Sequence, residues 1–368
     1  MRSRIKMDGK EQMKRNIKKR IRTRFPGVFL LLRTLDRVIH RDSFYIQRVL
    51  SIFDDPDNEY LDIKHNGDKY YGKILYVIRE NSNHEGFCAT LRFVIGFLIY
   101  AQEHGFEPVI KLTENYLYYD EQKSKEISNP WEYYFSVPDE RYDENSALHV
   151  CYSKYYHMMT VKEYQGLSAY SIENYYDERL FQVCSPIINK YLVLKPDITG
   201  DAAGILKRVK DNGKRILGVH FRGTDFKQGY NKHPVFVDAE QMLEAVKKAT
   251  DSGLFGAVFL ATDDALFYDR IRETAGDIEI LLHKDVFRSN GDTSVAFSES
   301  DREYHHYLLG YEIARDMYTL SLCDGLVAGK SSVSYMSNLY KHSRNENYEY
   351  IDIIDNGNNA NDKNSKSE

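Results

Sequence analysis

Apolar runs alternate with amphipathic segments in two parts of the chain. In the first part, the apolar run 73–79 precedes a helical pattern over 87–104 and a second apolar run at 108–112. This alternation is typical of parallel strands joined by a helix. Gly105 follows the helical pattern directly, where a glycine suits a helix end. We therefore expect a βαβ unit over residues 73–112.

The second alternating part is longer and extends from residue 215 to residue 340. Its expected strands lie at 216–221, 257–261, 278–282 and 325–328, and its expected helices at 239–249, 265–274, 307–322 and 331–340. Strands that alternate with helices in this way form a parallel sheet, so the predicted fold class is α/β. We find no repeat of 20 to 50 residues of the kind that marks a solenoid.

The length of 368 residues exceeds what one compact core usually holds, so we expect two domains. Pro and Gly with polar neighbours at 194–200 indicate the linker between them. The Asn-rich end lacks bulky apolar residues after Asn356 and is typical of a disordered tail. The predicted division is a basic arm and unassigned segment at 1–70, an N-terminal Rossmann-like domain at 71–195, a C-terminal one at 196–345, and a disordered tail at 346–368.

The charge is distributed unevenly along the chain. The net charge is −5, yet the first 24 residues hold eleven Lys and Arg against two acidic residues. Two interpretations stay open: residues 1–40, with the apolar stretch 25–32, lie on an anionic membrane surface, or the arm is simply solvated. The remainder of the chain is acidic, which argues against a nucleic-acid partner.

Neither a membrane span nor a secretory signal is expected. The stretch 25–32 is far shorter than the roughly 20 residues that cross a bilayer, and no small-residue cleavage site follows it. The four cysteines are widely spaced without metal-binding spacing: Cys88, Cys151, Cys184 and Cys323. They read as reduced thiols. We expect a cytoplasmic protein, at the inner face of the membrane if the basic arm binds lipid.

The loops that follow the predicted strands carry the candidate chemistry. Ligands of parallel sheets sit at the carboxyl ends of the strands. After the strand 216–221 the chain offers Arg222 and Asp225, and His220 lies near that strand's end. Because side chains of a strand alternate, His220 and Arg222 should point to the same side.

Two further loops contribute polar groups. Thr262, Asp263 and Asp264 form an acidic loop suited to accept hydrogen bonds from ribose hydroxyls or a base edge. Residues 329–332 form a small-residue turn that opens a helix, whose free amides favour a phosphate. Each loop also has a structural interpretation, as an Arg222–Asp225 ion pair or as helix N-caps.

These loops carry a resemblance to a known family. Segments 219–225, 259–264 and 323–334 are similar, in the same order, to three motifs of the α-1,6-fucosyltransferase and protein O-fucosyltransferase superfamily, which includes the rhizobial nodulation fucosyltransferases. Segment 85–100 resembles the family's glycine-containing loop and first helix, and segment 129–134 is similar to part of its bacterial branch. The likeness covers residues 73 to 342.

The resemblance implies a GT-B fold, in which two Rossmann-like domains face a cleft. It implies that the C-terminal domain holds a GDP-sugar and that the N-terminal domain contributes acceptor contacts. It further implies an inverting transfer of L-fucose from GDP-β-L-fucose to a glycan or glycoconjugate. No other cofactor is expected.

The resemblance also implies roles for individual residues. Arg222 would bind the donor pyrophosphate with His220 close to it, and Asp263 would reach the nucleoside. Ser331 and Ser332 would contact phosphate. The complete set of expected donor-binding residues is Arg222, His220, Thr262, Asp263, Asp264, Lys330, Ser331, Ser332, Gly86 and Phe87, and the expected catalytic residues are Arg222, Asp225 and His220.

The sequence departs from the α-1,6 branch at two points. Gly223 stands where that branch has a second basic residue, and no Asp or Glu lies between Asp225 and His233, where it has a candidate base. The linkage is therefore not inherited from that branch. For the general base, Asp225 and Glu132 both stay open, and Asp225 can instead orient Arg222.

Three other functions compete with fucosyl transfer. A different nucleotide-sugar donor or a non-catalytic carbohydrate-binding protein fits the same scaffold. A dinucleotide oxidoreductase is disfavoured because no GxGxxG follows the first strand, and the turn at Lys330 lacks P-loop spacing. We expect no metal, because Arg222, Lys330 and a helix N-terminus can supply the positive field at the pyrophosphate.

Overall fold

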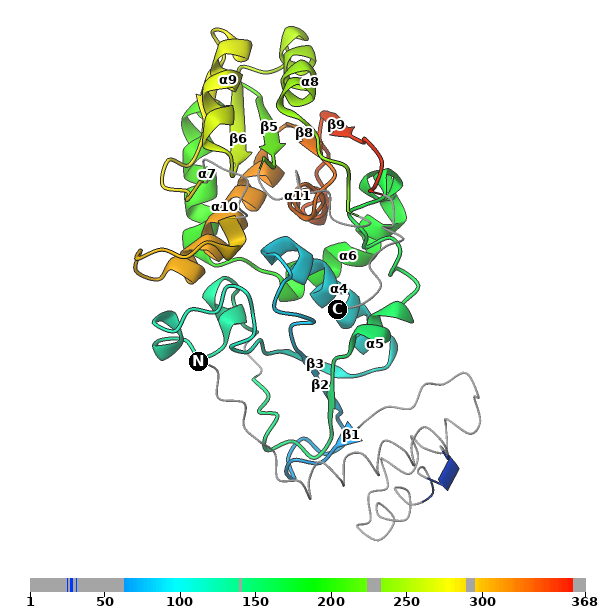
Figure 1. Ribbon diagram of the computed structural model, residues 1–368. Helices are drawn as coiled ribbons and strands as arrows, with labels where there is room; N and C mark the ends of the chain where they lie inside the picture. The colour runs from blue at the N-terminus through cyan, green and yellow to red at the C-terminus, as the bar shows by residue number, and fades with distance from the viewer. Residues whose placement is uncertain are drawn as a thin grey trace.

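The computed structural model describes residues 63–138, 141–223, 233–288 and 295–359, together with Phe25, Gly27, Val28 and Leu31. The predicted basic arm, Asp225 and residues 360–368 lie outside this set. The described chain forms two sheets, one in each half of the sequence (Figure 1). This is the α/β class that the apolar pattern predicts, and two α/β halves are what a GT-B fold requires.

The C-terminal sheet is entirely parallel and has the strand order β7-β6-β5-β8-β9. Its strands are β5 (Ile216–Phe221), β6 (Ala257–Thr262), β7 (Glu279–Leu281), β8 (Gly325–Gly329) and β9 (Tyr350–Ile354). Its helices are α7 (Pro196–Asp211), α8 (Ala239–Asp251), α9 (Ala265–Ala275), α10 (His305–Leu322) and α11 (Ser332–Ser343). Helices α8 and α9 cover one face, and α7, α10 and α11 lie on the other (Figure 1).

Strand β9 corrects the predicted disordered tail at 346–368. Residues 350–354 pair with β8 in parallel, with Val327 opposite Asp352. Alternate side chains of β9 pack on opposite faces of the sheet: Ile353 joins the core on the α10 side, and Ile354 packs on the α8 side. The apolar run is short and Asn-rich residues follow it, so the sequence pattern did not predict a strand here.

Helix α7 corrects the predicted linker at 194–200. Pro196 occupies the first position of this helix, where its fixed φ fits and its missing N–H costs nothing. The chain just before it is held by two backbone hydrogen bonds, from Ser136 N to Val193 O (2.8 Å) and from Lys195 N to Tyr134 O (2.9 Å). The junction between the two halves is therefore short and pinned to the N-terminal half.

The N-terminal sheet has the order β1-β4-β2-β3, with only β1 antiparallel to its neighbour. Its strands are β1 (Ile63–Lys64), β2 (Leu75–Ile78), β3 (Glu107–Ile110) and β4 (Val150–Tyr152), and the helices of this half are α4 (Phe87–Glu103), α5 (Tyr155–Met159) and α6 (Glu178–Tyr191). Short 3-10 turns lie at Lys123–Lys125, Pro130–Tyr133 and Ile172–Tyr176, and one more lies in the C-terminal half at Val295–Phe297. The expected βαβ unit is confirmed, and Gly105 has the positive φ of +62° that glycine permits. The sheet begins with β1, before the predicted boundary at residue 71.

The segment 116–191, which holds fourteen of the chain's thirty tyrosines, connects the two halves. The Tyr134 hydroxyl donates to Tyr307 O on α10 (3.0 Å), and the two rings stack. Gly310, one turn further along α10, has no room for a Cβ because the Tyr134 hydroxyl occupies that space. One hydrophobic cluster accordingly runs from α4 through α6 to α10 and α11.

Three sequence expectations concern absences. All four cysteines are free and buried. None of the described helices is long and apolar enough to cross a membrane. Within the same part of the chain, no group of three His, Cys, Asp or Glu is arranged to hold a metal ion.

Candidate functional site

The three polar loops meet at one edge of the C-terminal sheet. His220 at the end of β5 lies opposite Ala261 of β6 and Ala328 of β8. All three strands run parallel, so their carboxyl ends, and the loops that leave them, lie together. The predicted convergence is confirmed for the described loop residues.

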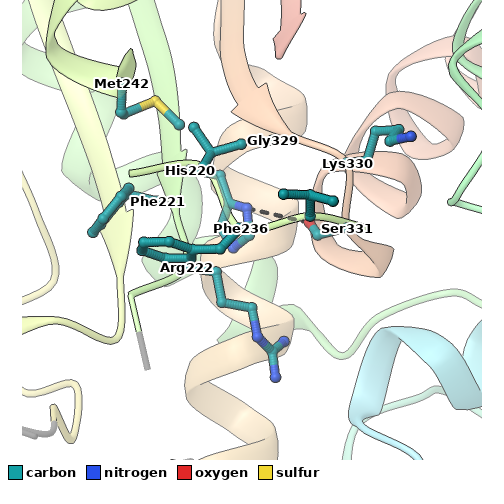
Figure 2. Close-up of a pocket in the computed structure, with 10 residues that line it drawn as sticks. His220, Phe221, Arg222, Phe236, Met242, Gly329, Lys330 and Ser331 are labelled. Carbon is teal, nitrogen blue, oxygen red and sulfur yellow. Dashed lines mark hydrogen bonds between the residues drawn. The ribbon is translucent and has the colours of Figure 1, made fainter. Parts of the chain in front are cut away.

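A pocket opens at this edge of the sheet. The end of β5, the β8–α11 turn, residues 235–237 and Met242 of α8 line it, and Figure 2 shows most of these residues. The lining residues are His220, Phe221, Arg222, Val235, Phe236, Val237, Met242, Gly329, Lys330 and Ser331. The lining combines apolar side chains with a few polar groups, as ligand pockets commonly do.

His220 is a neutral hydrogen-bonding group in this pocket. Its side chain is buried, and its Nδ1 lies 3.3 Å from the Ser331 hydroxyl (Figure 2). Burial, with a smaller contribution from the charge of Arg222, lowers the pKa of His220 to about 3. Near neutral pH this imidazole therefore carries no charge and can both donate and accept a hydrogen bond.

Arg222 points away from the His220–Ser331 pair, toward the N-terminal half. Figure 2 shows its guanidinium directed out of the pocket wall. Burial raises the pKa of the Cys88 thiol, and the positive charges of Arg92 and Arg222 oppose this rise. Arg222 is therefore near the first turn of α4. Phe221, between His220 and Arg222, points to the opposite face and stacks on Phe267 (3.9 Å between ring centroids).

The acidic loop after β6 has a largely structural arrangement. Asp264 caps α9, because its Oδ1 accepts from Leu266 N (2.9 Å) and Phe267 N (3.3 Å). The Thr262 hydroxyl accepts from Asp264 N (3.1 Å). Asp263 instead reaches across to β5, where its Oδ1 accepts from Gly223 N (2.8 Å). Thr262 and Asp264, two of the three residues predicted to contact the nucleoside, thus form hydrogen bonds within the loop itself, and Asp264 caps α9.

The β8–α11 turn presents backbone amides. Ser331 caps α11 by accepting from Ser334 N (3.1 Å), and its own amide donates to the Tyr175 hydroxyl (3.0 Å). No described residue accepts a hydrogen bond from the amides of Ser332 or Val333, which begin the helix. These two amides lie at the positive end of the helix dipole, which is a suitable environment for an anion.

Lys330 does not take the predicted place at a phosphate. Its side chain is 3% exposed, and its ammonium forms an ion pair with Asp355. It also donates to Tyr170 O (3.2 Å) and to Asn358 Oδ1 (3.0 Å). Figure 2 shows the amine pointing away from His220. The three ammonium protons are committed on the outer side of the turn, so the positive field at the pocket must come from Arg222 and the helix.

Gly86 and Phe87 begin α4 in the N-terminal half. The Phe87 amide donates to the Tyr118 hydroxyl (3.2 Å), and its ring lies in the core, parallel to that of Phe135. Phe87 therefore presents neither a free amide nor an exposed ring to a ligand. Gly86 has ordinary extended geometry as the N-cap, and a Cβ there would meet only the Tyr118 hydroxyl at 3.8 Å.

The structure describes only one of the two candidate bases. Asp225 lies outside the described residues. Glu132 lies in the turn Pro130–Tyr133, where its Oε2 is 3.6 Å from Arg141 Nη1 and its Oε1 accepts a long hydrogen bond from Asn129 (3.4 Å). No described contact joins Glu132 to the pocket.

A buried charged cluster on α10 escaped the sequence analysis. Burial raises the pKa of Asp316 to about 7, although the charges of Arg315 and Arg288 oppose the rise, and its Oδ1 has no hydrogen-bond partner. The spacing of Glu312, Arg315, Asp316 and Thr319 places them on one helix face. A polar stripe at i, i+3, i+4 and i+7 in an otherwise apolar helix was the available signal.

Comparison with known proteins gives structural neighbours only. No family model and no curated protein matches the sequence. Among solved structures, the chain is similar to NodZ α-1,6-fucosyltransferase soaked with GDP-fucose, at 16% identity and a TM-score of 0.44, over 73% of this chain and 92% of that one. It is also similar to POFUT1 in complex with GDP-fucose, at 12% identity and a TM-score of 0.42, over 78% of this chain and 99% of that one.

Proposed function

We propose that the protein is an inverting glycosyltransferase that transfers L-fucose from GDP-β-L-fucose to a glycan or glycoconjugate acceptor. The observation that carries the proposal is the convergence of three motif-bearing loops at one sheet edge. There His220 meets Ser331, and the open amides of α11 adjoin them. The order and spacing of the motifs, which resemble those of the fucosyltransferase superfamily, support fucose as the sugar.

Breaking the donor bond places negative charge on the leaving nucleotide. Fixed donors that meet such charge usually contribute most to catalysis. Arg222 offers a planar fork that binds two phosphate oxygens at once, and the Ser332 and Val333 amides add a helix N-terminus. His220, neutral and held by Ser331, is suited to a hydrogen bond with an uncharged part of the nucleotide or with a phosphate oxygen.

The transfer itself is a single displacement. The acceptor hydroxyl oxygen forms a bond to the anomeric carbon of the sugar while the bond to the β-phosphate oxygen breaks. GDP leaves with that electron pair, and a carboxylate takes the acceptor proton. For this carboxylate, Asp225 and Glu132 stay predictions. We further propose that no metal is required, because Arg222 and the α11 amides meet the charge.

The proposed partners are the nucleotide-sugar donor and the glycan or glycoconjugate acceptor. A cytoplasmic location, and contact of residues 1–40 with the inner face of a membrane, stay predictions, since the structure describes only four residues of that segment.

A thermal-shift series with GDP, UDP, ADP and NAD tests the proposal. A ligand at 100 times its dissociation constant stabilises the folded protein by about 2.7 kcal/mol, which is readily seen as a rise in Tm. We expect GDP to give the largest shift and GDP-fucose to be consumed when a glycan acceptor is added. A shift with UDP alone would leave a glycosyltransferase with another donor. Binding without turnover would favour a non-catalytic protein.

A further inference from the structure

The end of the described chain forms part of the pocket's surroundings. Val235 N donates to Gly357 O (3.0 Å), and Asn359 N donates to His233 O (2.9 Å). The Asn356 side chain adds a bond from Nδ2 to Phe236 O (3.0 Å). Residues 356–359 thus run antiparallel to residues 233–236 and hold the segment that supplies Val235, Phe236 and Val237 to the pocket.

Lys330 fastens this end segment to the opposite side of the pocket. It is the residue between β8 and the helix cap Ser331, and its buried ammonium binds the Asp355 carboxylate and the Asn358 side-chain oxygen. Asp355 directly follows β9, at the start of the end segment. The ion pair therefore joins the β8–α11 turn to the segment that holds residues 235–237.

The N-terminal half contributes a third anchor through Tyr170. Its carbonyl oxygen accepts from both Lys330 Nζ (3.2 Å) and Asn358 Nδ2 (3.2 Å). Its hydroxyl lies 3.4 Å from His233 Nδ1. Lys330, Asp355, Asn358 and Tyr170 together are called the latch below.

Stability alone is a weak reason for such an arrangement. Burying the Lys330 ammonium costs desolvation free energy, and an ion pair with the exposed Asp355 returns little of it. What the latch adds is a fixed direction for the end segment. The two sides of the pocket are also in tight contact, because a Cβ on Gly329 would lie 3.0 Å from Val237 Cγ2. A shift of the end segment therefore moves the wall against the turn.

We propose that the latch positions the wall 235–237 against His220 and the α11 turn, so that Lys330 and Asp355 are positioning residues for the nucleotide of the donor. This inference rests on the proposed function. Neither residue touches the ligand in this arrangement. The latch sets the width of the pocket, so its loss should weaken donor binding more than it changes the rate of the chemical step.

The test compares Lys330→Met and Asp355→Asn with the control Lys341→Met. Lys341 is also a buried lysine of α11, at the other end of the helix, where it donates to Cys323 O (2.8 Å). Calorimetry gives the Kd of GDP, denaturation gives the Tm, and donor kinetics separate KM from kcat. We expect Lys330→Met and Asp355→Asn each to weaken GDP binding roughly tenfold and to raise the donor KM, with kcat changed less than about twofold.

Lys341→Met should lower the Tm and keep the Kd of GDP within about twofold. The double variant Lys330→Met/Asp355→Asn should bind GDP no more weakly than the worse single variant, because both remove the same ion pair. Should Lys330→Met fail to fold, Asp355→Asn, which is isosteric and on an exposed residue, carries the test.

The outcomes separate the two proposals. Wild-type protein that binds GDP, with latch variants of unchanged Kd, overturns the latch and leaves the proposed function standing. Equal weakening by Lys341→Met also overturns it, since destabilisation alone would then explain the loss. Wild-type protein that binds no nucleotide overturns both.

Discussion

The backbone of Gly223 lies against the side chain of Asp264. A Cβ built on Gly223 would come within 2.5 Å of both Cβ and Oδ2 of Asp264, which is closer than real Cβ atoms approach. Asp264 cannot easily move away, because it caps α9. The glycine that replaces a second basic residue after Arg222 is therefore required by the neighbouring loop.

Substitution of Gly223 should consequently be costly. We expect Gly223→Ala to lower the free energy of unfolding by about 1 to 3 kcal/mol through overpacking, and to weaken GDP binding because the loop that carries Arg222 must shift. Urea denaturation and calorimetry measure the two effects. Gly204→Ala on the exposed face of α7 is the matched control, since a Cβ there meets nothing, and it should be neutral or stabilising by up to about 1 kcal/mol. Equal behaviour of the two variants would contradict this account.

Arg222 is the side chain whose loss should affect turnover most. If its guanidinium meets the charge that develops on the leaving GDP, Arg222→Ala should lose about 3 to 4 kcal/mol of transition-state stabilisation, a hundredfold to a thousandfold in rate. Arg222→Lys should recover only part, because lysine lacks the planar fork. Donor kinetics and Tm are measured on the same preparations.

A surface arginine serves as the control for Arg222. Arg208 pairs with Glu279 at the surface, so Arg208→Ala should leave both turnover and Tm nearly unchanged. A fall in Tm with full turnover per folded molecule in Arg222→Ala would assign Arg222 to loop structure instead.

The sequence predicted those elements that bury a whole apolar run or helix face. Strands β5, β6 and β8 and the helices between them follow directly from periodicity, because their positions depend on residues close in the chain. Strand β9 was missed because its residues pack on opposite faces of the sheet and precede a polar end. Pairing with β8 settles its structure, and that is a contact distant in sequence.

The candidate site, too, was predicted only where it depends on residues close in the chain. Strand alternation alone placed His220 and Arg222 on one side, and both line the same pocket, although the Arg222 guanidinium points away from His220. The direction of Lys330 was not predictable, because its partner Asp355 lies on a segment that reads as disordered. Likewise, the role of Asp264 as the cap of α9 depends on which of two adjacent aspartates turns toward the helix.

Metal removal tests a further part of the proposed mechanism. In the proposed mechanism Arg222 and the helix amides meet the charge on the leaving GDP, so transfer should persist in EDTA at its full rate. Arg222→Ala should be equally insensitive to EDTA at its lower rate. Loss of transfer in EDTA that Mn²⁺ restores would show that a cation meets the charge instead.

The last prediction concerns the pH dependence of stability. His220 has a folded-state pKa of about 3, mainly because of burial, against an ordinary value of 6.5. Above pH 6.5 the residue is neutral in both states, and its contribution is fully present. As pH falls from 6.5 toward 3, the unfolded chain binds a proton that the folded protein does not, so stability is lost.

His157 and His283, whose pKa values burial lowers to about 4, add to the same fall. Urea denaturation between pH 7 and pH 4 should therefore show a shallower decline in His220→Gln, by up to about 1.4 kcal/mol per pH unit, than in wild type. The exposed residue His84 is the control, and His84→Gln should follow the wild-type curve. Parallel curves for wild type and His220→Gln would mean that His220 binds a proton in the folded pocket as readily as in the unfolded chain.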